Sequence, residues 1–488
     1  MAAYDLIVRG GNIVGVGLPG GDPVRADVAV ADGRIVAVGL DLEGTAQEEI
    51  DATGLHVLPG AIDAHVHFNE PGRADWEGFA TGTRALAAGG ITAYAEMPLN
   101  AHPPTLDAQS FDLKLAAAKA SSLVDFALWG GLVPENVEHL EELAERGVLG
   151  FKAFMSDSGI EDFKAADDLV LYEGMQRAAE LGLPILVHAE SDQITGGLAR
   201  RALAEGRTQV RDYLASRPVV AEVEAIARAI VLAEETGCSL HVVHVSTGRG
   251  VALVAAARAR GANVTCETCT HYLVLTEDDV AKLGAVAKCA PPLRPRRDLE
   301  ALWEQVFEGN VDFVTSDHSP SPPEMKARDD FFTAWGGISG CQNTLNVVLD
   351  EGHHKRGLLL RQVAALTSGN VADRFKFFGK GRLEVGADAD LVLVDLDSSF
   401  TPRAEELFYR HKLSPYVGKT FRGSVVRTVV RGATVVRDGQ VVSEPVGRFI
   451  QPNRRTSATL GVGAGQAGQS SQASGTRGVD VQQAGEPN

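Results

Sequence analysis

The sequence is poor in cysteine, in positive charge and in long apolar runs. Five cysteines among 488 residues are too few for a disulfide framework and suit a reducing cytoplasm. Lysine and arginine number 46 against 64 acidic residues, and the net charge of −18 argues against nucleic acid or an anionic membrane as a partner. No apolar run reaches the ~18 residues of a membrane span, and the first residues lack the basic start of a signal peptide. We therefore expect a cytoplasmic protein with no nucleic-acid and no membrane partner.

Short apolar runs alternate with longer amphipathic stretches through residues 57–379. This alternation predicts strands at 61–65, 91–96, 125–129, 150–154, 185–188, 240–244, 263–266 and 311–315. Helices are expected between them, at 76–88, 107–120, 137–146, 168–181, 221–236, 251–260 and 299–307. Eight such strands predict an α/β fold, a (β/α)8 TIM-like barrel over 57–379. An open doubly wound sheet is the alternative, but no G-x-G-x-x-G fingerprint follows an early strand.

The two ends of the chain have a different pattern, made of short strands and tight turns. Asp32-Gly33 and Asp438-Gly439 are typical hairpin turn pairs. The stretch Val8–Gly11 also resembles Val430–Ala433, so we expect residues 1–56 and 380–450 to form one β unit. Two unrelated small sheets are the alternative. From 453 to 488 the chain is rich in glycine, serine and glutamine, which predicts a disordered tail.

Metal-capable side chains recur at the carboxyl ends of the predicted strands. They are His65, His67, Lys152, His188, His244 and Asp317. Each alone is more simply a rim histidine, a snorkelling lysine or a helix cap. In a barrel, however, these strand ends converge on one mouth, and such a set suffices for two divalent cations. His241 has the opposite parity to His244 in its strand, so we expect it to face the helices.

Lys152 is the most informative member of this set because it lies inside the apolar strand Gly150–Phe154. A buried charged amine is unfavourable unless it is paired or modified. Reaction of the neutral amine with CO₂ would give a carbamate, whose two oxygens can bridge two cations. The sequence therefore raises the hypothesis of a carbamylated lysine.

Several motifs resemble those of one enzyme family. The segment Pro59–His67 is similar to the metal motif of the amidohydrolase superfamily, in which the cyclic amidohydrolases are the most similar group. Within that group, other segments resemble the allantoinases most: Phe68–Arg73, Trp76–Phe79, Met97–Asn100, Ser316–Pro320, Pro322–Lys326 and Gly336–Gly340. The resemblance extends to about residue 450 and implies a barrel with a β-sandwich built from both termini.

The resemblance also implies roles for individual residues. His65 and His67 would bind one metal ion, His188 and His244 the other, and Lys152 would bridge them as N6-carboxylysine. Asp317 would bind a metal ion and act as the catalytic acid and base. Backbone groups near Ala290 and Gly336 would bind the substrate. The cofactors expected are two divalent ions, with Zn²⁺ suiting these ligands, and a homotetramer is implied.

The implied reaction is hydrolysis of the cyclic amide of allantoin to allantoate, by a bridging hydroxide on a binuclear centre. The partner is thus a small-molecule cyclic ureide. A hydantoinase, dihydropyrimidinase or dihydroorotase acting on a related ring is the nearest alternative. Hydantoinases carry tyrosine five residues after the bridging lysine, where this chain has Asp157. A non-enzymatic scaffold related to dihydropyrimidinase is the other alternative, against which the intact ligand set argues.

Overall fold

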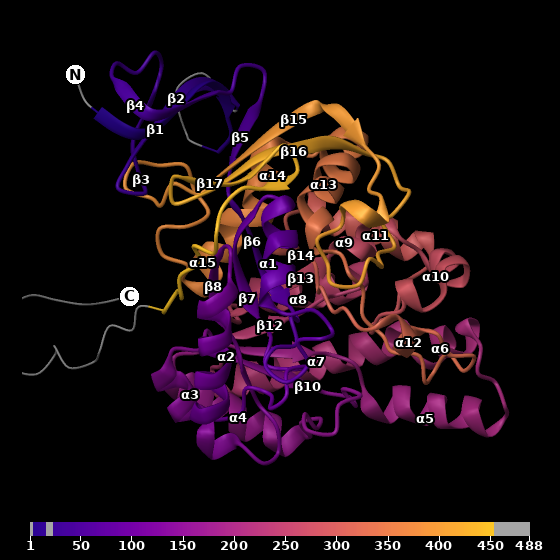
Figure 1. Ribbon diagram of the computed structural model, residues 1–488. Helices are drawn as coiled ribbons and strands as arrows, with labels where there is room; N and C mark the ends of the chain where they lie inside the picture. The colour runs from indigo at the N-terminus through magenta and orange to yellow at the C-terminus, as the bar shows by residue number, and fades with distance from the viewer. Residues whose placement is uncertain (1–2, 16–22, 453–488) are drawn as a thin grey trace, which may run out of the picture. The chain divides into compact units, whose positions relative to one another are not determined.

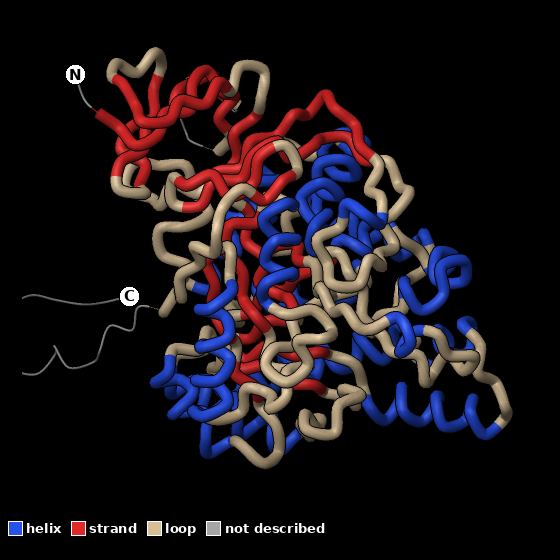
Figure 2. The backbone as a smooth tube through the Cα atoms, in the orientation of Figure 1, coloured by secondary structure: helices blue, strands red, loops and turns tan. Residues whose placement is uncertain are grey.

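The computed structural model describes residues 3–15 and 23–452 (Figure 1). The tail predicted over 453–488 lies outside the described residues. None of the described helices combines the length and the apolar character needed to cross a membrane. The described strands form a ring of parallel strands and a nine-stranded sheet that is largely antiparallel (Figure 2).

The ring contains eight strand positions in chain order. They are β6 (Ala61–Val66), β7 (Ile91–Glu96), β8 (Asp125–Leu128) continued by β9 (Gly130–Gly131), β10 (Phe151–Phe154), β11 (Ile185–His188), β12 (Leu240–Val242), β13 (Val264–Cys269) and β14 (Phe313–Thr315). Neighbours pair in parallel from β6 to β8 and from β9 to β14. Only Trp129 separates β8 from β9, and Val66 pairs with His318 just beyond β14, which closes the ring. The predicted TIM-like fold is therefore present.

The ring strands are apolar on both faces because both faces are covered. In β11, Ile185 and Val187 belong to the large hydrophobic cluster that includes residues of the surrounding helices. Leu186 between them belongs to a second cluster, with Trp129 and Phe313, that fills the ring. Alternate side chains of one strand thus pack into two different hydrophobic cores, one between the strands and the helices and one inside the ring. Polar side chains at the strand ends are consequently held by rigid surroundings.

Helices connect the ring strands and cover them (Figure 1). They are α1 (Phe79–Ala88), α2 (Ala108–Ser121), α3 (Leu140–Arg146), α4 (Asp168–Leu181), α5 (Asp192–Ala204), α6 (Val210–Ser216), α7 (Val219–Thr236), α8 (Gly248–Ala259), α9 (Thr270–Val274), α10 (Glu277–Leu283), α11 (Arg296–Phe307), α12 (Pro323–Lys326), α13 (Thr344–Val347), α14 (Leu360–Ala364) and α15 (Asn370–Phe375). The predicted helix at 168–181 coincides with α4, where the Asp167 carboxylate accepts the Val170 N–H at 2.9 Å and caps the first turn. Helices α5 and α6 were not predicted; α5 buries only Thr195 and Ala202, so few apolar positions mark it in the sequence.

The second sheet combines strands from both ends of the described chain. Its strands are β1 (Ala3–Ile13), β2 (Val24–Ala31), β3 (Arg34–Gly39), β4 (Thr45–Asp51), β5 (His56–Pro59), β15 (Leu391–Phe400), β16 (Phe421–Val430), β17 (Ala433–Arg437) and β18 (Gln440–Val441). Strand β5 pairs with β1 on one side and with β15 on the other. The predicted turn pair Asp32-Gly33 joins β2 to β3 with φ values of 52° and 73°, which is the geometry that glycine and aspartate tolerate. A separate domain with the boundaries 1–56 and 380–450 stays a prediction.

Candidate metal centre

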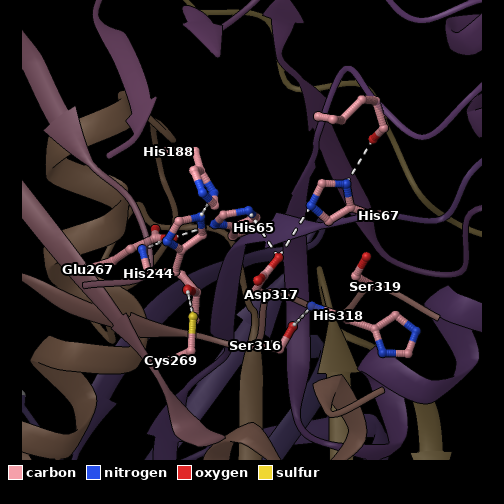
Figure 3. Close-up of polar contacts among 12 residues, drawn as sticks. His65, His67, His188, His244, Glu267, Cys269, Ser316, Asp317, His318 and Ser319 are labelled. Carbon is pink, nitrogen blue, oxygen red and sulfur yellow. Dashed lines mark hydrogen bonds and ion pairs between the residues drawn. The ribbon is translucent and has the colours of Figure 1, made fainter. Parts of the chain in front are cut away.

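One cavity of about 410 Å³ brings together every residue that the sequence singled out for the site. Its lining includes His65, His67, Lys152, His188, His244, Asp317, Ala290 and Gly336. The six candidate metal ligands come from five different ring strands or from the residues that directly follow them. Figure 3 shows the four histidines gathered around Asp317.

His65, His67 and Asp317 form the first group that could hold a cation. Asp317 Oδ1 lies 3.2 Å from His65 Nε2 and 3.3 Å from His67 Nε2. Asp317 follows β14 with a φ of 45°, so the backbone turns at this residue instead of continuing the strand. Burial raises the pKa of Asp317, but the neighbouring imidazoles outweigh it and hold the pKa well below its usual range. The carboxylate is therefore charged, as a ligand must be.

His188 and His244 form a separate pair of candidate ligands. His188 Nδ1 lies 3.0 Å from His244 Nε2, and their rings are arranged edge to face (Figure 3). Burial lowers the pKa of both imidazoles, and the pKa of His244 is well below its ordinary value. Neutral imidazole is the form that binds metal ions. Two ring nitrogens this close together can thus offer lone pairs to one cation.

Lys152 is completely buried beside these groups. Its Nζ has no hydrogen-bond partner within residues 3–15 and 23–452, and it lies 5.1 Å from the Phe154 ring centroid. Burial lowers the pKa of Lys152 to about 8, while Asp317 and Glu267 oppose this shift. An unpartnered buried amine is unfavourable, so a group that the chain itself does not supply would complete this position. The donor set and this orphaned atom together fit a metal centre.

Glu267 on β13 was not predicted, although it holds one of the histidines. Its Oε1 lies 2.5 Å from His65 Nδ1, and its Oε2 lies 3.2 Å from His241 Nε2. Burial raises the pKa of Glu267, but His65 and His241 overcome this effect and lower it to about 2. Lys152 was singled out because it is a charged residue inside an apolar strand. The same criterion could have identified Glu267.

The prediction that His241 faces the helices is wrong. Its ring stacks on Phe313 at 4.9 Å within the ring of strands, and its Nε2 bonds to Glu267. The prediction assumed one strand from 240 to 244, whereas β12 ends at Val242. His244 has a φ of 41°, so the alternation of side chains breaks between the two histidines and both turn inward.

A second buried carboxylate orients His188. Glu190 Oε2 accepts a hydrogen bond from His188 Nε2 at 3.0 Å and pairs with Arg217. Burial raises the pKa of Glu190, but Arg217 and His188 lower it to about 2. His67 is fixed differently, because its Nδ1 lies 2.8 Å from the Leu99 carbonyl oxygen. Partners of this kind fix the tautomer and the direction of a metal-binding imidazole.

The remaining wall of the cavity contains residues that the sequence did not indicate. They are Tyr213, Arg217, Lys288, Phe332 and Trp335, among others. Cys269 and His271 lie near Asp317 and form a second group of possible ligands, but it shares Asp317 with the first. All five cysteines are buried and unpaired.

Comparisons with known proteins show what this chain is similar to as a whole. Residues 56–435 match the sequence model of the Amidohydrolase family. The chain is 69% identical to an allantoinase from Rubrobacter xylanophilus, across 93% of this chain and 99% of that protein. It is 55% identical to an allantoinase from Solibacter usitatus, across 94% of this chain and 99% of that protein. A solved L-hydantoinase (dihydropyrimidinase) from Arthrobacter aurescens superposes with a TM-score of 0.89 at 36% identity, covering 92% of this chain and 100% of that one.

Proposed function

Because this chain belongs to the amidohydrolase family, we propose that its cavity is the active site of a metal-dependent hydrolase that opens the ring of allantoin to give allantoate. One observation carries the proposal: a completely buried lysine amine without a hydrogen-bond partner shares a cavity with four imidazoles and a carboxylate. Relatives named allantoinases, 55–69% identical over nearly the whole chain, support allantoin as the substrate.

The proposed cofactor is a pair of divalent cations, with Zn²⁺ suiting imidazole and carboxylate ligands. His65 and His67 would hold one ion, His188 and His244 the other, and Asp317 would complete the first group. Lys152 would bridge the two as a carbamate, which accounts for an amine that the chain leaves unpaired. When bound, the two cations would polarise the amide carbonyl and activate a water molecule.

The side chains around this centre have distinct tasks in the proposed reaction. Asp317 would accept the proton of the attacking water and deliver it to the ring nitrogen that leaves. Its low pKa keeps it ionised and ready to accept before the reaction begins. Glu267 and Glu190 would keep His65 and His188 in their ligand orientations. Backbone groups of Ala290 and Gly336 would hold the ring in the cavity.

The test compares turnover of several rings by the purified full chain supplied with Zn²⁺ and bicarbonate. Allantoin, hydantoin, dihydrouracil and dihydroorotate would be compared by kcat/KM, with Asp317→Asn as an inactive control. The highest value on allantoin supports the proposal, and a higher value on another ring overturns the choice of substrate. Failure to take up stoichiometric metal would instead favour the non-enzymatic scaffold.

Two further expectations accompany this proposal. The homotetramer implied by resemblance stays a prediction, which light scattering would test. The cytoplasmic location also stays a prediction.

A further inference from the structure

One wall of the cavity is an irregular segment that needs outside support. Residues 332–337 all line the cavity, and 331–337 contain neither helix nor strand. Gly337 has a φ of 109°, and a Cβ there would lie 2.2 Å from the Ser319 carbonyl oxygen. The segment therefore follows a closely packed path that requires glycine at position 337, without the hydrogen-bond ladder of a sheet.

Lys288 holds the first half of this segment. Its Nζ donates to the carbonyl oxygens of Phe331 at 2.6 Å, Ala334 at 2.5 Å and Phe332 at 3.3 Å. An ammonium group has three N–H donors, so these three carbonyls use all of them. The Nζ also lies 4.5 Å from the Tyr213 ring centroid.

Lys326 holds the second half in the same way. Its Nζ donates to the carbonyl oxygens of Gly337 at 2.7 Å, Ala285 at 3.2 Å and Trp335 at 3.4 Å. These contacts again account for all three donors. Within the described part of the chain, no carboxylate forms an ion pair with either lysine, although the protein is rich in acidic residues.

Such an arrangement is unfavourable for the lysines themselves. A buried ammonium group without an anion loses hydration that carbonyl dipoles replace only in part. Burial, Arg217 and Lys326 lower the pKa of Lys288 to about 7, with Asp330 opposing them. Burial lowers the pKa of Lys326 to about 8. Two lysine side chains nevertheless donate to the carbonyls of this one segment of seven residues. This indicates that the backbone conformation of 331–337 is important for the cavity.

We propose that Lys288 and Lys326 are positioning residues for the substrate, which act by holding the carbonyls of 331–337 so that Trp335 and Gly336 face the bound ring. The inference rests on the proposed function and extends it to the choice of substrate. Neither lysine has an N–H left for the reacting atoms, so each acts through the segment.

The test uses Lys288→Met and Lys326→Met in the metal-loaded full chain. Lys282→Met, which removes an exposed lysine from α10, is the matched control. Each of these two variants is expected to raise the KM for allantoin about tenfold while kcat changes less than about threefold, because binding geometry is lost and the candidate metal ligands are unchanged. Hydrogen exchange of the amides in 331–337 should accelerate in both variants and stay unchanged in the control.

An unchanged KM with unchanged exchange would overturn the proposal, as would a fall in kcat at constant KM. If Lys288→Met does not fold, Lys326→Met decides, because Lys326 holds the same segment from outside the cavity lining. Failure of the proposed function is distinguishable, since the wild-type protein would then turn over a different ring. The same variants would be compared on that ring, and the exchange measurement does not depend on the substrate.

Discussion

Replacing Glu267 by glutamine is expected to weaken metal binding without unfolding the barrel. The Glu267 carboxylate accepts hydrogen bonds from two imidazoles, at 2.5 Å from His65 and 3.2 Å from His241. Glutamine keeps the shape but offers one oxygen and one NH₂ group in place of two oxygens. One imidazole N–H would therefore face a donor, and His65 would lose the partner that directs its Nε2 toward the cavity.

The size of the effect follows from this geometry. Loss of an outer partner of a metal-binding histidine weakens metal affinity by about 10–100-fold, which corresponds to about 1.4–2.8 kcal/mol. We expect the upper part of this range, because Glu267 is 1% exposed and water cannot replace it. His241→Phe leaves the bond between Glu267 and His65 in place and is expected to have a smaller effect.

The assay is competition for Zn²⁺ between the apoprotein and a chromophoric chelator. Glu304→Gln is the control, since Glu304 is exposed on α11. Thermal unfolding of each apoprotein would show that the variants are folded before zinc is added. An affinity of Glu267→Gln within twofold of wild type would refute the idea that Glu267 orients His65.

Further perturbations address other parts of the molecule. Lys152→Ala should abolish turnover, and short carboxylic acids should restore part of it by replacing the carbamate; full activity without them would contradict this role. Removal of metal by a chelator should abolish activity and lower the melting temperature, and zinc with bicarbonate should restore both. Trp129→Ala should lower the free energy of unfolding by about 3–5 kcal/mol in urea titrations, because this side chain is fully buried. Above the pKa of Lys288 of about 7, the amine keeps two N–H donors for three carbonyls, so the KM should rise toward alkaline pH in wild type. The rise should be smaller and begin at higher pH in Lys288→Met, where Lys326 with its pKa of about 8 still titrates.

Several ring strands could be predicted from the sequence because they are short, largely apolar runs between longer amphipathic stretches. The expected strands at 91–96 and 185–188 coincide with β7 and β11. The same regularity singled out the candidate ligands, since His188 ends β11 and Asp317 follows β14. Parallel strands carry such residues to one mouth whatever their distance along the chain.

The supporting residues could not be predicted in this way. Glu267 is 202 positions from His65, and only the closed ring places the two side chains together. His241 was misplaced because parity along a strand holds only while the strand continues, and β12 ends before His244. The role of Lys288 depends on where an irregular segment folds back, for which the sequence contains no periodic signal.

The aromatic packing inside the barrel also bears on how a product would leave the cavity. Trp129, His241, Phe313 and Phe375 pack edge to face or stacked within the ring, with centroids 4.8–5.4 Å apart. These side chains belong to the cluster that fills the interior of the ring, while the cavity lies among the segments at the carboxyl ends of the strands. In the proposed reaction the opened product would carry a new carboxylate, and its release would be slower the more firmly the proposed cations bound that group.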